Sequence, residues 1–275
     1  MIGISSVGIC SDIVQRYYGT FLCLALIHSC MVGELYLHDS YAQEMRASVR
    51  GVTEDGVILG NTVFYAQGGG QPGDTGTLKI LPDGATFRVT NTVKRDGHIV
   101  HVIGQHSITE HNVVECFIDW PRRYAHMRYH TAAHLFASVL HRDHGALITG
   151  NQIGEDRLRI DFALDQYDPA QLQRAVAETN RIIAQHHDVH VRFLERDEAL
   201  ALPGIVKLAG AHVPDIPVLR IVTIGDPKAP VDEQADGGTH VHNTRELAPL
   251  VIVSTENKGK NNRRVYVQFA PAEDK

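Results

Sequence analysis

The feature that most limits the fold of this chain is a change of pattern near residue 120. From Glu34 to about Asp119, short runs of β-forming residues alternate with turn sequences such as Asp96-Gly97. Six short strands at this spacing favour a small β-barrel. The strands predicted are Glu34–His38, Met45–Val52, Val57–Leu59, Thr86–Val93, His98–Val102 and Val113–Ile118.

A helical pattern takes over at Pro121, since proline suits the first turn of a helix. This helix is expected to run to about His144 and to end at Gly145. A second helix is expected to begin at Asp168-Pro169. The strands predicted around the two helices are Arg157–Phe162, Val189–Leu194, Val218–Ile224 and Val265–Phe269. Helices interleaved with mostly antiparallel strands predict an α+β fold.

These patterns predict three parts of the chain. Residues 1–33 are a poorly ordered extension or an upstream start, 34–120 form the barrel, and 121–275 form the α+β domain with a metal site on its first long helix. The apolar run Phe21–Ile27 is too short to cross a bilayer. The alternative is that it forms the core of a signal sequence.

The bulk composition is that of an ordinary globular protein, with 43% hydrophobic and 21% charged residues. The four cysteines show no Cys-x-x-Cys spacing, so neither a disulfide framework nor a thiolate zinc site is expected. A reducing cytoplasm is the default location, and no membrane contact is expected. The oligomeric state is left open.

Any contact with nucleic acid must be local, because the formal net charge is -6. Four positive charges gather in one stretch, at Lys258, Lys260, Arg263 and Arg264. We interpret the stretch as a candidate RNA contact. The alternative is a solvated hairpin turn.

The strongest local motif is His130-Thr131-Ala132-Ala133-His134, within the first predicted helix. Residues four apart on a helix lie one turn above each other, so both imidazoles can reach one cation. Such nitrogen donors suit zinc. A pair of ordinary surface or core histidines is the alternative, since the chain has 17 histidines in all. The motif lacks the glutamate that follows the first histidine in zinc peptidases.

A second motif, Asp236-Gly237-Gly238-Thr239-His240, puts two glycines between a carboxylate and an imidazole. The small residues allow both side chains to turn towards one ion. A polar surface turn is the alternative. Taken together, the two motifs offer four metal ligands, namely His130, His134, Asp236 and His240.

A third motif is the glycine-rich loop 67–76, which begins Gln67-Gly68-Gly69-Gly70-Gln71. Its glycines allow close approach to another surface, and free amides there can hold a phosphate or a ribose hydroxyl. We therefore predict that Gly68, Gly69, Gly70 and Gln71 bind substrate. The loop is not a nucleotide P-loop, because no Gly-Lys-Ser/Thr follows it. The alternative is a complex turn between strands.

These motifs occur in an order that resembles the free-standing alanyl-tRNA editing proteins, the AlaX group, which is related to the editing domain of alanyl-tRNA synthetase. The resemblance covers roughly residues 34 to 270. It rests on Thr62–Tyr65, the glycine-rich loop, the two metal-ligand motifs, Thr149–Gln152 and Arg264–Val267.

The resemblance implies one zinc ion per chain, with His130, His134 and His240 as ligands. It also implies that the protein edits tRNA(Ala) in trans, hydrolysing the ester of Ser-tRNA(Ala) by zinc-assisted attack of water. Gly-tRNA(Ala) is left open as a second substrate. Asp236 stands where the family pattern has cysteine, so the metal is less certain at this position. Asp236 either binds the metal itself or binds a metal-coordinated water.

Serine exceeds alanine by one hydroxyl, so an editing pocket has to hydrogen-bond that group. Thr149 and Gln152, expected in a loop after the first helix, are the candidates for this catalytic selection. The alternative is that they tie the loop. Thr131 is disfavoured, since a helical threonine often bonds its own preceding turn.

Two other functions share the same residues. One is a metal-dependent hydrolase of a small ester or amide, which would not need the basic stretch. The other is a non-catalytic module that binds tRNA or a synthetase and uses the metal to hold its fold.

Overall fold

The computed structural model describes residues 33–164, 168–207, 209, 215–259 and 261–271. The predicted extension at 1–33 lies outside them apart from Gly33. The described residues form three antiparallel sheets around one long helix, which confirms the α+β class. No helix in these ranges combines the length and the apolar character that a membrane crossing requires.

The first sheet has seven strands in the order β4-β3-β7-β1-β2-β6-β5. A short 3-10 helix, η1 (Leu35–Leu37), precedes it where the sequence predicted a strand. The predicted strand Thr86–Val93 is two strands, and Gly76–Leu81 is a strand that was not predicted. The strands are β1 (Glu44–Val52), β2 (Gly56–Leu59), β3 (Gly76–Leu81), β4 (Thr86–Val89), β5 (Asn91–Arg95), β6 (His98–Val102) and β7 (Val113–Ile118).

The prediction of a closed barrel is wrong for the described residues, because β4 and β5 are the two edges of this sheet and do not pair with each other. One residue, Thr90, joins them. Its backbone N–H and its hydroxyl both donate to Val102 O, at 2.8 and 3.2 Å. The chain therefore passes from one edge to the other without a turn that would allow the two strands to pair.

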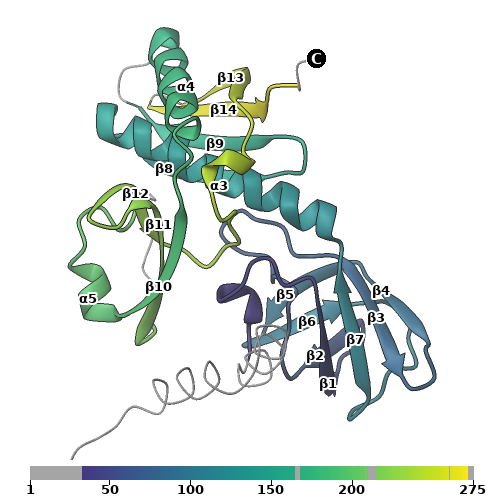
Figure 1. The fold of residues 1–275 in the computed structure, drawn as a ribbon. Coiled ribbons are helices and arrows are strands. Elements are labelled where there is room, and N and C mark those ends of the chain that lie inside the picture. Colours follow the sequence, from purple (N-terminus) through teal and green to yellow (C-terminus); the bar gives the residue numbers. More distant parts are fainter. Residues whose placement is uncertain (1–32, 165–167, 208, 210–214, 260, 272–275) are drawn as a thin grey trace, which may run out of the picture.

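The long helix α3 (Trp120–His144) carries a proline in its first turn and ends at Gly145, as predicted. Gly145 has φ 63°, a left-handed conformation that glycine adopts at little cost, and its N–H donates to His141 O at 2.8 Å. Figure 1 shows α3 crossing the middle of the molecule, with the seven-stranded sheet at its N-terminal end.

The C-terminal half of α3 packs on a four-stranded sheet and on α4 (Pro169–Ile183). The sheet has the order β13-β14-β9-β8. Its strands are β8 (Leu147–Ile153), β9 (Leu158–Ala163), β13 (Leu250–Gly259) and β14 (Asn262–Phe269). The helix α4 begins as predicted, because the Asp168 side chain accepts from Ala170 N at 2.9 Å in a capping box.

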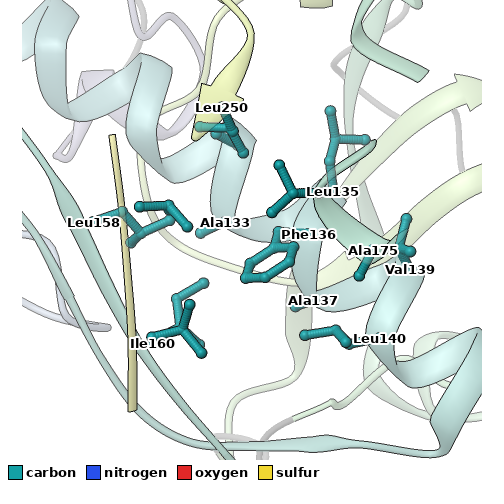
Figure 2. Packing of buried hydrophobic residues seen from close by; sticks show 14 of the residues in the cluster. Ala133, Leu135, Phe136, Ala137, Val139, Leu140, Leu158, Ile160, Ala175 and Leu250 are labelled. Carbon is teal, nitrogen blue, oxygen red and sulfur yellow. The ribbon is translucent and has the colours of Figure 1, made fainter. Parts of the chain in front are cut away.

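The main apolar core lies where α3, α4 and this sheet meet (Figure 2). Phe136 is fully buried there, and its ring meets that of Phe162 edge-to-face with centroids 5.6 Å apart. Truncating such a ring to alanine costs about 3–5 kcal/mol. This core holds the middle of α3 in place.

A third sheet, with order β10-β11-β12, flanks α3 on another side. Its strands are β10 (Val189–Glu195), β11 (Val218–Asp226) and β12 (Ala229–Ala235). Two short helices accompany it, α5 (Arg196–Leu200) and η2 (Thr244–Glu246). On β12 the buried positions alternate and include Asp232 and Gln234, so these two side chains share the inner face.

Arg123, in the first turn of α3, fastens the helix to the seven-stranded sheet. It is fully buried and its Nε donates to both carboxylate oxygens of Asp74, at 3.0 and 2.9 Å. Its two other nitrogens donate to Ser40 O and Val63 O at 2.9 and 2.6 Å. Breaking a buried pair of this kind costs about 3–5 kcal/mol, so the orientation of α3 relative to the sheet is fixed.

Candidate metal centre

Four side chains from two distant segments converge beside α3. His130 and His134 come from one face of the helix, and Asp236 and His240 come from the loop that follows β12. One ligand atom from each lies within 4.8 Å of all the others. This is the convergence that the spacing of the two motifs predicted.

The ring of His130 is oriented from the glycine-rich loop. Its Nδ1 lies 3.0 Å from Oε1 of Gln71, which also accepts from the backbone N–H of Thr239 at 3.1 Å. Gln71 donates through Nε2 to the Thr239 hydroxyl at 2.8 Å. The amide oxygen is thus an acceptor, so His130 carries its proton on Nδ1.

The ring of His134 is oriented from β12. Its Nδ1 donates to Asp232 Oδ2 at 2.9 Å. Asp232 is buried and also pairs with Lys207, while Gln234 Nε2 donates to both of its oxygens. Burial alone would raise the pKa of Asp232, but His134 and Lys207 hold that pKa at about 2. A permanent carboxylate therefore faces the imidazole.

The ring of His240 is oriented from α3 itself. Its Nδ1 lies 3.1 Å from the hydroxyl of Thr131, which donates its own hydrogen to Met127 O at 3.1 Å. The hydroxyl can therefore only accept from His240, and it accepts from Val241 N at 3.3 Å as well. The expectation that Thr131 bonds its own preceding turn is confirmed.

All three histidines thus use Nδ1 for a protein partner, which leaves Nε2 for the centre of the cluster. Metal-binding histidines have this arrangement, in which the outer hydrogen bond fixes the tautomer and the ring orientation. Burial lowers the pKa of His130 well below its usual value and that of His240 to about 4. Neutral imidazole is the form that binds a metal.

Asp236 approaches the same centre as a carboxylate. Its Oδ2 lies 3.0 Å from His240 Nε2 and accepts from Gly238 N at 2.7 Å, while Oδ1 lies 3.6 Å from His130 Nε2. Burial would raise the pKa of Asp236, but the neighbouring histidines hold it well below its usual value. The group is therefore ionised.

Gly238 is required where the two segments meet. A Cβ at this position would overlap the ring of His130 at Cε1 and Nδ1, whereas a Cβ at Gly237 would meet nothing within 4 Å. The second glycine of the motif thus permits the close approach of loop and helix, and the first is free of that constraint.

Two cavities lie on either side of the glycine-rich loop. The larger, of about 570 Å³, opens beside the cluster, with Asp236, Gly237 and Gly238 in its wall. The smaller, of about 410 Å³, lies between the loop and β8. Gln67, Gly68 and Gly69 line both, so the loop separates two adjoining spaces.

The predicted loop residues divide between these spaces and the cluster. Gly68 and Gly69 line both cavities, and Gly70 lines the smaller one. Gly70 has φ +85°, and a Cβ there would overlap the side chain of Asn151. Gln71 also borders the smaller cavity, but its side chain is fully buried and contacts His130. The sequence did not predict that contact.

Thr149 and Gln152 lie on the strand β8, so the prediction that they occupy a loop is wrong. Gln152 is exposed and lines the smaller cavity. Thr149 is exposed, and its hydroxyl donates to Asn262 Oδ1 at 3.1 Å. That bond joins β8 to the start of β14. It agrees with the alternative interpretation, in which Thr149 holds its segment in place.

The basic stretch lies at the β13–β14 hairpin turn. This position agrees with the alternative interpretation, a solvated hairpin turn. Arg264 is engaged there, since Nε and Nη2 donate to the two oxygens of Asp161 at 2.8 and 2.9 Å. Lys258 is exposed, and Arg263 lies beside it on the partner strand. Lys260 lies outside the described residues.

Sequence reasoning missed the residues that surround the cluster, among them Asp232 and Gln234. A signal for them was present, since Asp232, Gln234 and Asp236 alternate along one strand and its extension, and alternate residues share a face. No comparable signal marked Lys207 or Arg220, because each reaches the site from a separate segment.

Comparison with known proteins shows that two parts of the chain match domains of tRNA synthetases. Residues 29–122 match the family model described as tRNA synthetases class II (A). Residues 219–266, which include Asp236 and His240, match the threonyl and alanyl tRNA synthetase second additional domain.

Similarity over most of the chain identifies the family. The chain is 43% identical to alanyl-tRNA editing protein AlaX-M of Saccharolobus solfataricus, over 88% of this chain and 100% of that protein. It is 42% identical to the AlaX-M of Methanosarcina barkeri, over 86% and 98%. It is also 34% identical to alanine–tRNA ligase of Methanothrix thermoacetophila, over 87% of this chain but 25% of the ligase. This chain belongs to the AlaX-M family of alanyl-tRNA editing proteins.

Proposed function

We propose that this protein hydrolyses the aminoacyl ester of mischarged tRNA(Ala), with Ser-tRNA(Ala) as the main substrate. One observation carries the proposal: three imidazoles and a carboxylate, each held by an outer partner, converge beside a cavity of about 570 Å³ that Asp236 lines. The AlaX-M relatives, by their names, edit alanyl-tRNA.

The donor set fits a zinc ion. His130, His134 and His240 would bind through Nε2, since each Nδ1 is already used, and Asp236 would bind through a carboxylate oxygen. A bound zinc would supply Lewis-acid chemistry, either activating water or polarising the ester carbonyl. A carboxylate in place of the family cysteine makes the set harder, so manganese or iron also have to be assayed.

The residues around the cluster do the positioning. Tyr65 and Phe193 give the cavity large apolar walls, and the glycine-rich loop forms one rim. Such walls suit an aminoacyl group and its adenosine, with the ester directed at the polar cluster. An aminoacyl ester is already activated, so water can attack it and no covalent nucleophile on the protein is required.

Selection of serine is proposed to involve Thr149 and Gln152. Gln152 lines the smaller cavity together with Gly69 and Gly70, which supports a contact with substrate. Thr149 needs a test that separates selection from a structural role, because its hydroxyl already bonds Asn262. If Thr149 selects serine, Thr149→Val lowers the rate on Ser-tRNA(Ala) more than that on Gly-tRNA(Ala). Equal losses of rate on the two substrates, with the same result in Asn262→Ala, would mean that Thr149 only holds β8 in place.

The tRNA body is proposed to contact the hairpin through Lys258, Lys260 and Arg263. Arg264 is left out of this proposal because it already pairs with Asp161. Replacing Lys258 and Arg263 by glutamine should weaken tRNA binding and its salt dependence while leaving hydrolysis of a seryl-adenosine ester unchanged. Unchanged tRNA binding would favour a hydrolase of small esters instead.

The deciding experiment compares deacylation of Ser-, Gly- and Ala-tRNA(Ala) by the full chain. We expect hydrolysis of Ser-tRNA(Ala) well above that of Ala-tRNA(Ala), with about one zinc bound per chain. Chelation should abolish hydrolysis and added zinc should restore it, and His134→Ala should bind no zinc. Full activity of a metal-free preparation would contradict the metal part, and a metal-bound but inactive protein would favour a binding module.

A further inference from the structure

Arg220, on β11, is buried in the wall of the larger cavity with part of its guanidinium unused. The residue is 7% exposed. Its Nε donates to Leu37 O at 2.8 Å and its Nη1 to Asp236 O at 2.7 Å. Its Nη2 has no hydrogen-bond partner among the described residues. Leu37 and Asp236 line the same cavity, so two fixed bonds hold the guanidinium across its wall.

Three other arginines among the described residues also have one buried nitrogen without a partner, but of these four only Arg220 lines the larger cavity. An unpaired donor of a buried charged group is costly in free energy. Burial lowers the pKa of Arg220, and Asp236, Tyr65 and Tyr36 oppose this only in part, but arginine stays charged in proteins. The cavity wall therefore holds one cationic nitrogen that no described protein group uses.

The position of this donor relates it to the reacting ester. Arg220 Nη1 lies 3.8 Å from Asp236 Oδ2, and Asp236 Oδ1 lies 3.6 Å from His130 Nε2. The guanidinium therefore lies next to the four clustered side chains, on the side of Asp236. The other cation of the cavity, Lys94, is 55% exposed and paired with Glu34 at 2.8 Å, so it belongs to the rim.

We propose that Arg220 is a catalytic residue that binds the carbonyl oxygen of the aminoacyl ester through Nη2. This proposal rests on the proposed deacylase function. In the reaction, the oxygen of water bonds to the carbonyl carbon and the π pair moves onto the carbonyl oxygen. Arg220 stabilises that oxyanion by hydrogen bonding and transfers no proton.

The second step of the reaction breaks the ester bond. When the electron pair returns from the oxyanion, the bond between carbon and ribose oxygen breaks. The ribose oxygen leaves with one proton of the attacking water, the other proton of that water passes to solvent, and the amino acid departs as its carboxylate. Donors aimed at such an oxyanion act mainly in the transition state, so they raise kcat more than they tighten substrate binding.

Arg220→Gln tests the proposal, with Arg192→Gln as the matched control. Arg192 lies on the neighbouring strand β10 and pairs with Glu233 at 2.8 Å, outside both cavities. In single-turnover deacylation of Ser-tRNA(Ala), we expect the rate of Arg220→Gln to fall about 100-fold. Half-saturation, and affinity for a non-hydrolysable 3′-seryl-amide of adenosine, should change less than about threefold. The control should match the unmodified chain.

Chemical rescue separates a catalytic from a structural role. Guanidinium ion added to Arg220→Ala should restore part of the rate, and Arg220→Lys should retain more rate than Arg220→Gln. Zinc content and Tm are measured on each variant, and if Arg220→Gln is unstable, rescue of Arg220→Ala decides. An unchanged rate, a change in half-saturation alone, or no rescue would overturn the proposal. Failure of the unmodified chain to deacylate would instead reject the proposed function.

Discussion

Gln71 Oε1 lies 3.0 Å from Nδ1 of His130, so the glycine-rich loop of the first sheet orients a side chain of the candidate metal centre. The loop therefore has two roles in this structure. Its glycines border the cavities, and its glutamine supports a ligand of the cluster.

Gln71→Ala should weaken metal binding about 10- to 100-fold, because loss of an outer partner frees the ring of a ligand histidine. Competition with a chelator measures this affinity. Gln67→Ala is the control, since Gln67 is exposed and only accepts a long bond from Asn91 at 3.4 Å. Equal zinc affinity of Gln71→Ala and the unmodified chain would remove Gln71 from the support of the site.

Asp232→Asn should also weaken metal binding about 10- to 100-fold, because the amide is neutral and holds the ring of His134 less firmly. The same change leaves Lys207 buried without its counter-charge, so Tm should fall. Glu233→Gln, at the adjacent position, alters the pairing with Arg192 instead and should keep full zinc affinity. If both variants bound zinc equally, Asp232 would have only a structural role.

Gly238→Ala and Gly237→Ala form a matched pair. The first puts a methyl group into the ring of His130, and the second puts it into open space. We expect Gly238→Ala to lose most zinc binding and deacylation and Gly237→Ala to keep both to within about threefold. Zinc content per chain and the rate on Ser-tRNA(Ala) provide the comparison. Normal zinc content in Gly238→Ala would contradict the packing described.

His101 lies away from the cluster and leads to a prediction of how stability depends on pH. It is fully buried in the first sheet, its Nε2 lies 2.8 Å from the Thr62 hydroxyl, and burial lowers its pKa from 6.5 to about 4. Below pH 6.5 the unfolded chain binds a proton that the folded chain does not, so stability falls as pH drops towards 4 and then levels off. We expect this residue to account for about 1–3 kcal/mol.

Urea unfolding at pH 7 and pH 4.5 measures that contribution. The difference in free energy of unfolding between the two pH values should be smaller in His101→Gln than in the unmodified chain. His126 and His240 titrate in both proteins, so their contributions cancel in the comparison. An identical pH dependence would show that His101 is not protonated on unfolding in this range.

The sequence predicted the elements whose signals are local. Pro121 and Gly145 set the limits of α3, and Asp168 with Pro169 started α4. It missed β12 and β8 because their composition is dictated by the site. On β12, Asp232 and Gln234 hold His134 from the buried face, and on β8, Thr149 and Gln152 were expected in a loop. The predicted strand Glu34–His38 failed because tertiary packing of Leu35 and Tyr36 outweighed its β propensity.

The four proposed ligands could be found because each motif is short and the spacing on a helix is fixed. Their outer partners could not: for Thr131 the hydrogen bond to the preceding turn was predicted, but its contact with His240 was not. Gln71 and Asp232 approach from separate sheets, so their contacts depend on how the sheets pack around α3. Alternation along β12 marks the face on which Asp232 lies, but no local pattern in a single sequence marks which side chain it contacts.

The ring of His130 occupies the space that any side chain at position 238 would need. The helix and the loop therefore interlock, and neither segment can change size alone. A substitution at 238 becomes acceptable only with a smaller residue at 130, and that replacement removes an imidazole. A variant of this protein that keeps the histidine at position 130 must therefore also keep the glycine at position 238.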